Sequence, residues 1–382
     1  MAQVATVPDG TLAVVVTKKD DPKLRILDCE IVMESDLFAI RDDAWWRGVR
    51  SGQLPVDRQG LAMRVIPGER IGPCYRGFAI ELGDAERRYA RRYSIYSLRD
   101  TAQRAIARLL QQKVLQAEDS VNYFLTALPE GKSGGASGEG KSAPPEPAAP
   151  PAALKVTPRS PSLTLEEASL SAYLRASEPL EKGWATPALS TEEPDKANEM
   201  TVLFSPMAWE LGRQFARRGQ DVESAAVWTG RLFRDLDSPE VFMLIEACIE
   251  AQHASEDRYS VTFSGATWGR VHEVLGKRRR RLNRPHEIIL GSVHGHNFAP
   301  GTEEEGRKLC DACELQPSCS RTTAIASTLD TQWHKSVFAG QPYAVLGIWG
   351  YSARGDEVWQ LYGLEEGTLV ARGARILVGE PD

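Results

Sequence analysis

The residues of this 382-residue chain that could carry out chemistry together lie in its C-terminal half. They are two histidines separated by one residue, a serine and an aspartate three residues apart, and an upstream glutamate: His294, His296, Ser327, Asp330 and Glu223. A hydrolytic zinc site uses this inventory, because three protein ligands leave one coordination position for water. A separate carboxylate then takes the proton of that water. The residue types therefore indicate a candidate site for metal-dependent hydrolysis.

The secondary structure predicted around these residues can bring them together. Residues 287–293 (Glu-Ile-Ile-Leu-Gly-Ser-Val) have the apolar pattern of a buried strand. Residues i and i+2 of a strand face the same side, so His294 and His296 can point both imidazoles at one ion. Ser327 and Asp330 would share one face of a helical turn that begins near them. Asp330 can then complete the ligand set, and the Ser327 hydroxyl can point at the same cavity.

The order Glu, His-x-His, Ser-x-x-Asp resembles the motif of the JAB/MPN (JAMM) metallopeptidases, zinc isopeptidases that cut ubiquitin and ubiquitin-like modifiers from their targets. The resemblance covers roughly residues 199–378, and residues 223–230 are similar to the family's Glu-x-x-Gly-x-Leu-x-Gly segment. Three features depart from the family pattern. Gly295 stands where Ser or Thr is usual, Asn297 stands where Pro is usual, and an insertion over residues 298–326 lengthens a gap that is normally short.

The resemblance implies a role for each site residue. His294, His296 and Asp330 would hold a catalytic zinc ion. Glu223 would accept a proton from water and deliver it to the leaving lysine amine, and Ser327 would donate a hydrogen bond to the tetrahedral oxyanion. The substrate would be a ubiquitin-like protein, cleaved from its conjugates or from a precursor extension.

The resemblance also implies partners, because bacterial members of the family accompany activating and conjugating enzymes in ubiquitin-like systems, some of them antiviral. One alternative is a non-catalytic MPN scaffold that binds ubiquitin-like partners, although such scaffolds usually lack zinc ligands that this chain keeps. Another is a zinc enzyme of a different class. A deaminase would need His-x-Glu together with Pro-Cys-x-x-Cys, and here Leu309 precedes the first cysteine.

Three cysteines within ten residues lie inside the insertion: Cys310, Cys313 and Cys319. Their spacing is typical of a structural zinc knuckle that lacks one ligand. His334 and Cys248 are candidates for the fourth ligand, and reduced thiols on a surface loop are the alternative to a metal. Cys29, Cys74 and Cys248 occur singly in strand-like runs and are predicted to be core residues.

Composition predicts two globular parts of the α/β (α+β) class, joined by a linker. Residues 1–128 form an N-terminal α/β module that binds a partner or substrate, or only packs. Residues 129–198 are a Pro/Ala/Gly-rich linker with a short helical segment. Residues 199–382 form the metallopeptidase domain, a JAB/MPN-type sheet flanked by helices.

The elements expected inside these parts follow from periodicity and capping residues. In the N-terminal module, four strands are expected near residues 12–17, 25–33, 61–66 and 75–82. They precede a helix over 97–117 that Ser97 would cap and that would bury Ile106, Leu110 and Val114. In the C-terminal domain, a helix from Ser205 would bury Met207, Leu211 and Phe215, and a helix capped by Ser264 would bury Trp268, Val271 and Leu275.

Charge and hydropathy limit the partners and the compartment. The net charge of −6 argues against bulk nucleic-acid binding. No stretch approaches the roughly 20 apolar residues of a membrane span, and no basic region precedes the apolar run 12–16, so we expect no signal peptide. Six cysteines are too few for a disulfide scaffold, which favours the cytoplasm. The basic run 277–281 is interpreted as a solvated helix end, with a grip on an acidic partner as the alternative.

Overall fold

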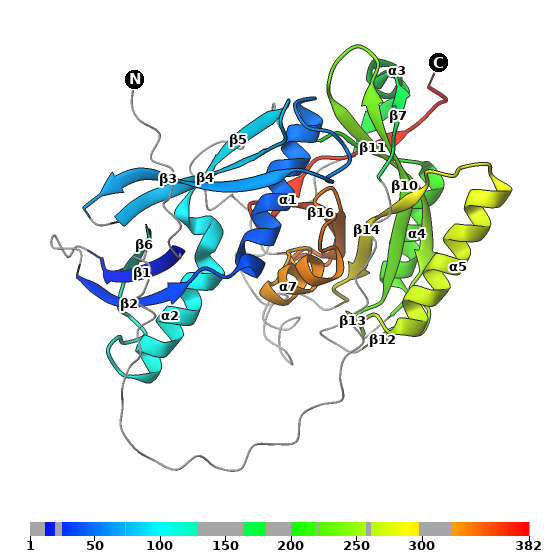
Figure 1. The fold of residues 1–382 in the computed structure, drawn as a ribbon. Coiled ribbons are helices and arrows are strands. Elements are labelled where there is room, and N and C mark those ends of the chain that lie inside the picture. Colours follow the sequence, from blue (N-terminus) through cyan, green and yellow to red (C-terminus); the bar gives the residue numbers. More distant parts are fainter. Residues whose placement is uncertain are drawn as a thin grey trace. The chain divides into compact units, whose positions relative to one another are not determined.

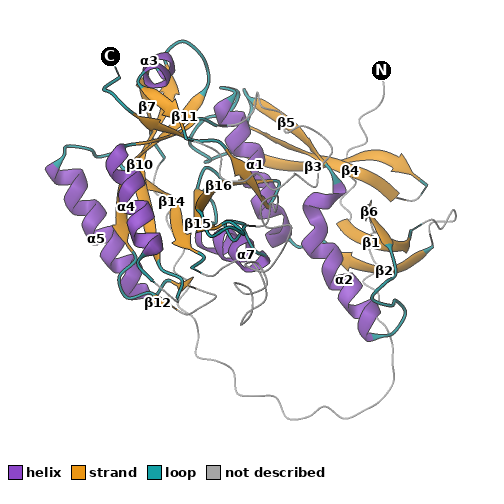
Figure 2. Ribbon diagram, turned by 180° about the vertical axis from the view of Figure 1, so that it is seen from behind, coloured by secondary structure: helices purple, strands orange, loops and turns teal. Residues whose placement is uncertain are grey.

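The computed structural model describes residues 12–19, 25–72, 74–127, 163–180, 200–219, 222–256, 261–297 and 322–381. The chain divides into two compact units. The first comprises Met1–Phe38, Leu61–Gly83 and Ala90–Leu163, and the second comprises Ala39–Gly60, Asp84–Tyr89 and Thr164–Asp382. Both mix helices with strands, so the predicted α/β class is confirmed (Figures 1 and 2). In the part of the chain just defined, no helix is both long and apolar enough to cross a membrane.

A six-stranded sheet with the order β2-β1-β6-β4-β3 organises the first unit, and β5 pairs with β4. Its strands are β1 (Leu12–Lys18), β2 (Ile26–Ile31), β3 (Ala62–Ile71), β4 (Cys74–Gly83), β5 (Arg88–Tyr93) and β6 (Val121–Ala127). The first four correspond to the four predicted strands. Sequence reasoning did not find β5 and β6, whose charged and polar residues interrupt the apolar alternation.

The predicted helix of this unit exists, but its start and its buried face differ from the prediction. A short 3-10 helix, η1 (Ile95–Leu98), is capped by Ser94, and α2 (Arg99–Gln111) follows without a side-chain cap. The expected stripe is wrong, because Leu110 and Val114 are 40% and 47% exposed. Its buried face is instead made of Thr101, Ala102, Ala105 and Leu109. Small residues let the helix approach β1, where Ala105 and Leu109 pack with Val16.

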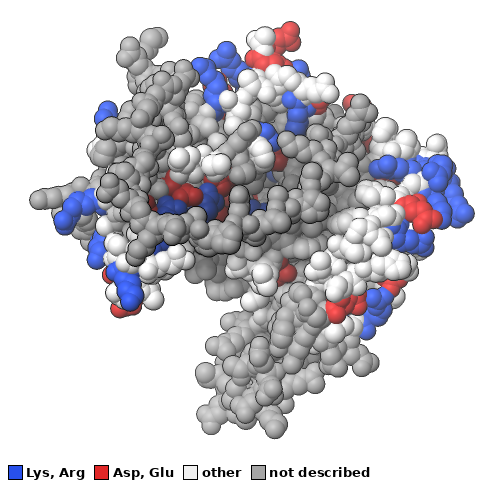
Figure 3. All heavy atoms as spheres, turned by 60° about the horizontal axis from the view of Figure 1, so that its bottom comes forward, with Lys and Arg blue, Asp and Glu red and all other residues white. Residues whose placement is uncertain are grey.

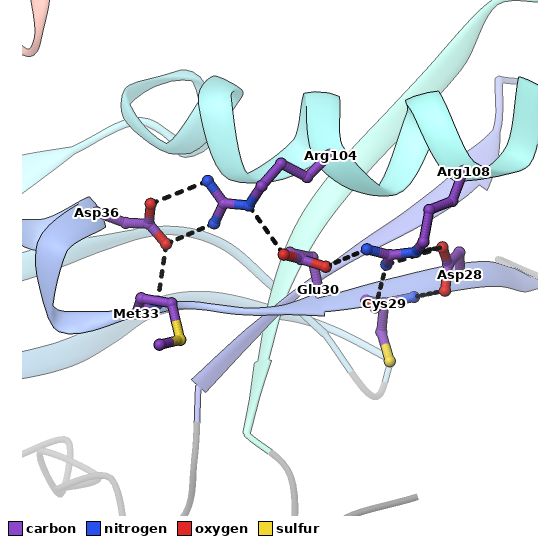
Figure 4. Close-up of polar contacts among 7 residues, drawn as sticks. All are labelled: Asp28, Cys29, Glu30, Met33, Asp36, Arg104 and Arg108. Atoms are coloured by element: carbon purple, nitrogen blue, oxygen red, sulfur yellow. Dashed lines mark hydrogen bonds and ion pairs between the residues drawn. The ribbon is translucent and has the colours of Figure 1, made fainter. Parts of the chain in front are cut away.

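Two arginines join α2 to the edge strand β2 (Figure 4). Arg104 and Arg108 are one helical turn apart on α2. Asp28 and Glu30 are two residues apart on β2 and face the same side, so each arginine can reach a carboxylate of the strand. Arg104 contacts Glu30 at 2.8 Å and Asp36 at 2.7 Å, and Arg108 contacts Asp28 at 3.0 Å. Asp28 and Glu30 face α2, and Cys29, which lies between them in the sequence, is exposed. The prediction that Cys29 is a core residue was therefore wrong. Cys74 and Cys248 are buried as predicted.

The second unit is built on a ten-stranded mixed sheet with the order β17-β16-β15-β14-β10-β11-β9-β18-β8, and β7 pairs with β10. Its strands are β7 (Leu165–Ala168), β8 (Ser177–Pro179), β9 (Val202–Phe204), β10 (Ala225–Asp235), β11 (Val241–Glu250), β14 (Ile288–Gly295), β15 (Val345–Tyr351), β16 (Glu357–Glu365), β17 (Thr368–Arg372) and β18 (Arg375–Leu377). A separate two-stranded ladder joins β12 (Ser255–Glu256) to β13 (Val261–Thr262). The helices are α1 (Glu34–Arg50), most of which belongs here, α3 (Leu170–Arg175), α4 (Pro206–Arg217), α5 (Gly265–Arg281) and α7 (Thr328–Val337).

Helices α4 and α5 cover opposite faces of this sheet, because neighbouring side chains of β10 point to opposite sides. Val227 packs with Val271 and Leu275 of α5, as the predicted stripe required. Trp228 is fully buried against α4, where a Cβ atom on Gly212 would lie 2.8 Å from its indole nitrogen. The predicted stripe of α4 is shifted by one residue, since Met207 is 71% exposed and Ala208, Gly212 and Ala216 are buried. Glycine is needed at position 212 because the indole of Trp228 fills the space that a side chain would occupy.

Both caps predicted for these helices are present. Ser205 caps α4 by accepting the Ala208 N–H, and Ser264 forms a capping box with Thr267 at the start of α5. The basic run ends α5, where Lys and Arg side chains gather with a few carboxylates (Figure 3). Part of the run is used internally, because Arg278 contacts the Glu287 carboxylate at 2.8 Å and Arg279 donates to its carbonyl at 2.6 Å.

Helix α1 was not predicted, and it packs within the second unit from residue 39 onward. Its buried residues include Trp46, whose ring lies 5.4 Å from that of Tyr343. Arg234 of β10 donates to the carbonyl of Val49 at 2.9 Å. The buried face of α1 includes a charged residue, because Arg47 is buried and pairs with Glu365. The sequence of α1 therefore lacks a clear apolar stripe.

The packing of Trp228 predicts a stability difference between two glycines. A Cβ atom on Gly347 would lie 2.2 Å from the Trp228 ring, so Gly347→Ala should destabilise the fold by about 1–3 kcal/mol. Gly269 lies in α5 with no atom within 4 Å of its Cβ position, so Gly269→Ala should instead stabilise the fold by about 0.5–1 kcal/mol. Urea unfolding of the two variants beside the parent protein measures both. Equal effects would contradict this account of the core.

Candidate metal centre

Strand pairing brings the Glu223 segment to the histidine pair. Strands β10 and β14 run antiparallel, with Ala225 opposite His294, so residues just before β10 lie beside residues at the end of β14. Gly295 N–H donates to the Ser224 carbonyl at 3.1 Å, which extends the pairing past the last ladder residue. Glu223, His294 and His296 are all at most 5% exposed. His294 therefore lies on β14, and Glu223 and His296 lie within two residues of the paired strands.

The two departures from the JAMM pattern next to the histidines have structural reasons. A Cβ atom on Gly295 would lie 1.9 Å from the carbonyl oxygen of Ala216 in α4, so no larger residue fits between the histidines. Asn297 donates to the carbonyl of Val222 at 2.8 Å and accepts from Arg217 at 3.0 Å. The asparagine therefore ties the end of β14 to the segment that carries Glu223, a role that sequence reasoning missed.

His296 is held in one tautomer by a backbone carbonyl. Its Nδ1 lies 2.6 Å from the Thr323 oxygen and donates to it, which leaves Nε2 as a lone-pair donor for a metal. Thr323 is fixed in turn by β15, because its N–H donates to the Tyr351 carbonyl at 3.0 Å and its hydroxyl oxygen accepts the Tyr351 N–H at 2.8 Å. Sequence reasoning could not find this contact, since it joins a backbone atom to a residue 27 positions away.

Ser327 and Asp330 form the capping box of α7. The Ser327 hydroxyl oxygen accepts the Asp330 N–H at 3.1 Å, and Asp330 Oδ2 accepts the Ser327 N–H at 2.7 Å. This reciprocal pair fixes the carboxylate and aims Oδ1 at His294 Nε2, 3.2 Å away. The Ser327 hydroxyl hydrogen is not used by this cap and is available to donate. The Ser-x-x-Asp spacing therefore starts a helix and positions an acid with the same atoms.

The donor atoms are spaced as metal ligands are. The two histidine Nε2 atoms are 3.1 Å apart, and Asp330 oxygens lie 3.2 Å from His294 Nε2 and 3.7 Å from His296 Nε2. A tetrahedral zinc with bonds near 2.05 Å would separate its ligands by about 3.3 Å. Glu223 Oε1 lies 3.6 Å from His296 Nε2, and the donor atoms of Glu223, His294 and His296 all fall within 4.8 Å of one another. The buried group of Glu223, His294 and His296 could hold a metal ion. The Asp330 carboxylate also lies near both histidines and is a second candidate for the carboxylate ligand.

The pKa values of the two histidines are shifted in opposite directions. Burial disfavours protonation of His294, but the hydrogen bond and charge of Asp330, with the charge of Glu223, outweigh burial and raise the pKa of His294. Burial and the neighbouring His294 lower the pKa of His296 to about 4. Burial would raise the pKa of Asp330, yet contact with both histidines holds it below its usual range. These shifts favour a protonated His294 beside the Asp330 carboxylate and a neutral His296.

A cleft of about 430 Å³ opens onto the cluster. Its floor contains Glu223, His294 and Asp330, and its walls come from α7 and β13. The cleft therefore reaches donor atoms that are otherwise buried.

The predicted structural zinc site of the cysteine cluster would be distinct from the histidine centre. Cys310, Cys313 and Cys319 lie outside the described residues, so their site stays a prediction. His334, one candidate for its fourth ligand, is fully buried in α7 and packs against the ring of Phe338. Cys248, the other candidate, is buried in β11.

Comparisons with known proteins add little to this picture. No family model matches the chain, and no curated protein matches it. One similar solved structure is the solution structure of a protein from Desulfitobacterium hafniense, with 16% identity and a TM-score of 0.29. The match covers 46% of this chain and 92% of that protein. A likeness this slight supports no inference about fold or function.

The geometry predicts which residues hold the metal. His294→Ala combined with His296→Ala should remove one equivalent of bound metal, and Asp330→Asn should weaken binding by more than the roughly 10–100-fold typical of outer-shell changes. Asp235→Asn is the matched control, because Asp235 also accepts a backbone N–H at a helix start, that of Leu170, outside the cluster. Metal analysis after dialysis measures all three. Normal metal content in the double histidine variant would refute the centre.

The raised pKa of His294 predicts pH-dependent metal binding. A metal needs neutral imidazoles, so binding must displace the His294 proton, and the affinity should fall about tenfold per pH unit below that pKa. In the metal-free protein, the stability contributed by the His294–Asp330 pair depends on pH with the opposite sign to the metal affinity. The His294–Asp330 pair contributes stability that is fully present below the ordinary histidine pKa of about 6.5 and is lost as the pH rises through the raised value. Calorimetric titration in buffers of different ionisation enthalpy counts the released proton. A proton count of zero near pH 6 would contradict this assignment.

Proposed function

We propose that this chain is a zinc-dependent peptidase that cleaves after a ubiquitin-like modifier. One observation supports the proposal: the buried residues Glu223, His294 and His296 form a group that could hold a metal ion. The half-buried Asp330 carboxylate joins it, with oxygens 3.2 Å from His294 Nε2 and 3.7 Å from His296 Nε2. The chemistry of the donors favours zinc, since two imidazoles with a carboxylate are a usual catalytic zinc set, whereas magnesium and calcium prefer oxygen ligands. A zinc ion bound there would act as a Lewis acid and lower the pKa of water toward neutrality.

The protein's own residues would then divide the work. His294, His296 and Asp330 would hold the ion, because their donor atoms form the tightest triangle. Glu223, buried beside His296, would take a proton from water and return it to the leaving amine. Ser327 would donate its free hydroxyl hydrogen to the oxyanion, a contribution typically worth about 2.7–4 kcal/mol. These are the roles that the JAMM resemblance implies.

The cleft supports an extended peptide as substrate. Strand β13 forms one wall and pairs with β12 in a two-stranded ladder. An extended segment could add to its other edge by main-chain hydrogen bonds. A modifier's C-terminal tail has this form, whether it ends in an isopeptide bond to a target or in a precursor extension. By the JAMM resemblance, such a modifier would act with activating and conjugating enzymes in a bacterial cytoplasmic system, of the kind that includes antiviral ones.

A substitution of the proposed base separates chemistry from metal binding. Glu223→Gln keeps the size of the side chain but cannot accept the proton, so turnover of a modifier–reporter fusion should fall by about 10²–10⁴-fold. Metal content should stay normal, which distinguishes this variant from Asp330→Asn. Glu246→Gln is a control on the same sheet, since Glu246 pairs with Arg231 away from the cluster. Full turnover by Glu223→Gln would place the base elsewhere, and loss of metal would make Glu223 a ligand.

A further inference from the structure

We infer that the cleft selects uncharged side chains next to the scissile bond and that Leu329 is a specificity-determining residue for that choice; this inference rests on the proposed function. The first observation is the helical spacing of one wall. Leu329, Gln332, Trp333 and Ser336 of α7 line the cleft. These positions are i, i+3, i+4 and i+7, so they form one continuous face of the helix. The residue next to Leu329 is Asp330, and the face therefore begins at the metal centre.

The facing wall has the same character. Val261 and Thr262 of β13 line it, so both walls present apolar groups and uncharged polar groups. Among the described lining residues, the ionisable side chains are Glu223, His294 and Asp330, all of which belong to the metal centre. A divalent ion there would balance the two carboxylates, since two positive charges meet two negative ones. A charged substrate side chain would thus lose hydration in the cleft without gaining an opposite charge from these walls.

Aromatic contacts join the two walls. Phe263 directly follows β13, and its ring lies 5.1 Å from that of Trp333 in an edge-on arrangement. The ring of Trp268 in α5 lies 5.2 Å from that of Phe263. These contacts connect α7 and α5 to the strand that forms the facing wall, which favours walls that keep their separation.

Leu329 stands out on this wall because it is a large apolar side chain that is 66% exposed. It lies in the first turn of α7, where an acidic residue would suit the helix dipole better. A leucine there supplies apolar surface to an aliphatic substrate side chain. The ligand class is therefore an extended peptide whose residues before the scissile carbonyl are aliphatic or small, and neither basic nor acidic.

The test uses quenched tetrapeptides joined by an isopeptide bond to a lysine reporter, with Leu, Arg or Glu placed in turn at each position before the scissile bond. At one position at least, the zinc-loaded parent protein should cleave the Leu peptide about tenfold faster, as kcat/KM, than the Arg or Glu peptide. Fluorescein-labelled peptide amides of the same sequences measure binding by anisotropy, independently of cleavage. The same order of preference is expected in Kd.

Leu329→Glu then tests the residue itself. The new carboxylate should raise the preference for Arg over Leu by about tenfold at the position that contacts it, mainly through KM, with unchanged metal content. Leu236→Glu is the matched control, because Leu236 is 61% exposed outside the lining of the cleft and should leave the preference unaltered.

The outcomes separate this inference from the proposed function. Selective binding of Leu peptides without cleavage of any peptide would support the inference and refute the peptidase. Equal or better cleavage and binding of Arg or Glu peptides would overturn the inference while the peptidase stands. Absence of binding by every peptide, or the same behaviour in Leu329→Glu and Leu236→Glu, would also overturn it.

Discussion

The antiparallel pairing of β10 with β14 is the constraint on which the centre depends. Ala225 lies opposite His294, so the register decides that Glu223 reaches the histidines. Side chains of a strand alternate between faces, and a slip of one residue would turn both imidazoles to the opposite face. Buried side chains hold this register, among them Val227 toward α5 and Trp228 toward α4. The core therefore specifies the site as well as supporting it.

Around this pairing, each polar group that approaches the histidines is tied to a second element. The Thr323 carbonyl, fixed to β15, orients His296. Asn297 bridges the end of β14 to the Glu223 segment, and the capping box of α7 orients Asp330. Such supports matter because a metal centre tolerates errors of only about 0.5 Å in its ligands. Here each support is a hydrogen bond between a side chain and the backbone.

The cluster, which could hold a metal ion, has to balance the charges of its own side chains. Two imidazoles and two carboxylates in a buried space would be costly if all their charges were unbalanced. The contact of His294 with Asp330, which raises the pKa of His294, and a neutral His296 reduce this cost. A metal ion bound in the cluster would take the place of the His294 proton. Metal binding and protonation would then be alternative ways to neutralise the same carboxylates.

Much of the site was predictable from local sequence rules. The His-x-His spacing on a strand, the Ser-x-x-Asp capping box and the cap at Ser264 depend on neighbours a few residues away, which periodicity describes. Helix faces were less predictable: Met207 and Leu110 are exposed because alanine and glycine let α4 and α2 approach the sheets closely. Helix α1 was missed because buried ion pairs, such as that of Arg47, look like surface charge in a sequence.

By itself, the sequence indicated the α/β class, the first four strands, the strand that carries the histidines, the helices α2, α4 and α5, and the five side chains that could form a hydrolytic centre. Only the tertiary structure decided that Glu223 meets the histidines, that Thr323 and Asn297 support them, and that a cleft between α7 and β13 leads to them. The physical reason is range. Strand register, the close approach of Ala216 to Gly295 and the contact between Phe263 and Trp333 join residues far apart in the chain. Such contacts depend on how whole elements pack, which no local pattern records.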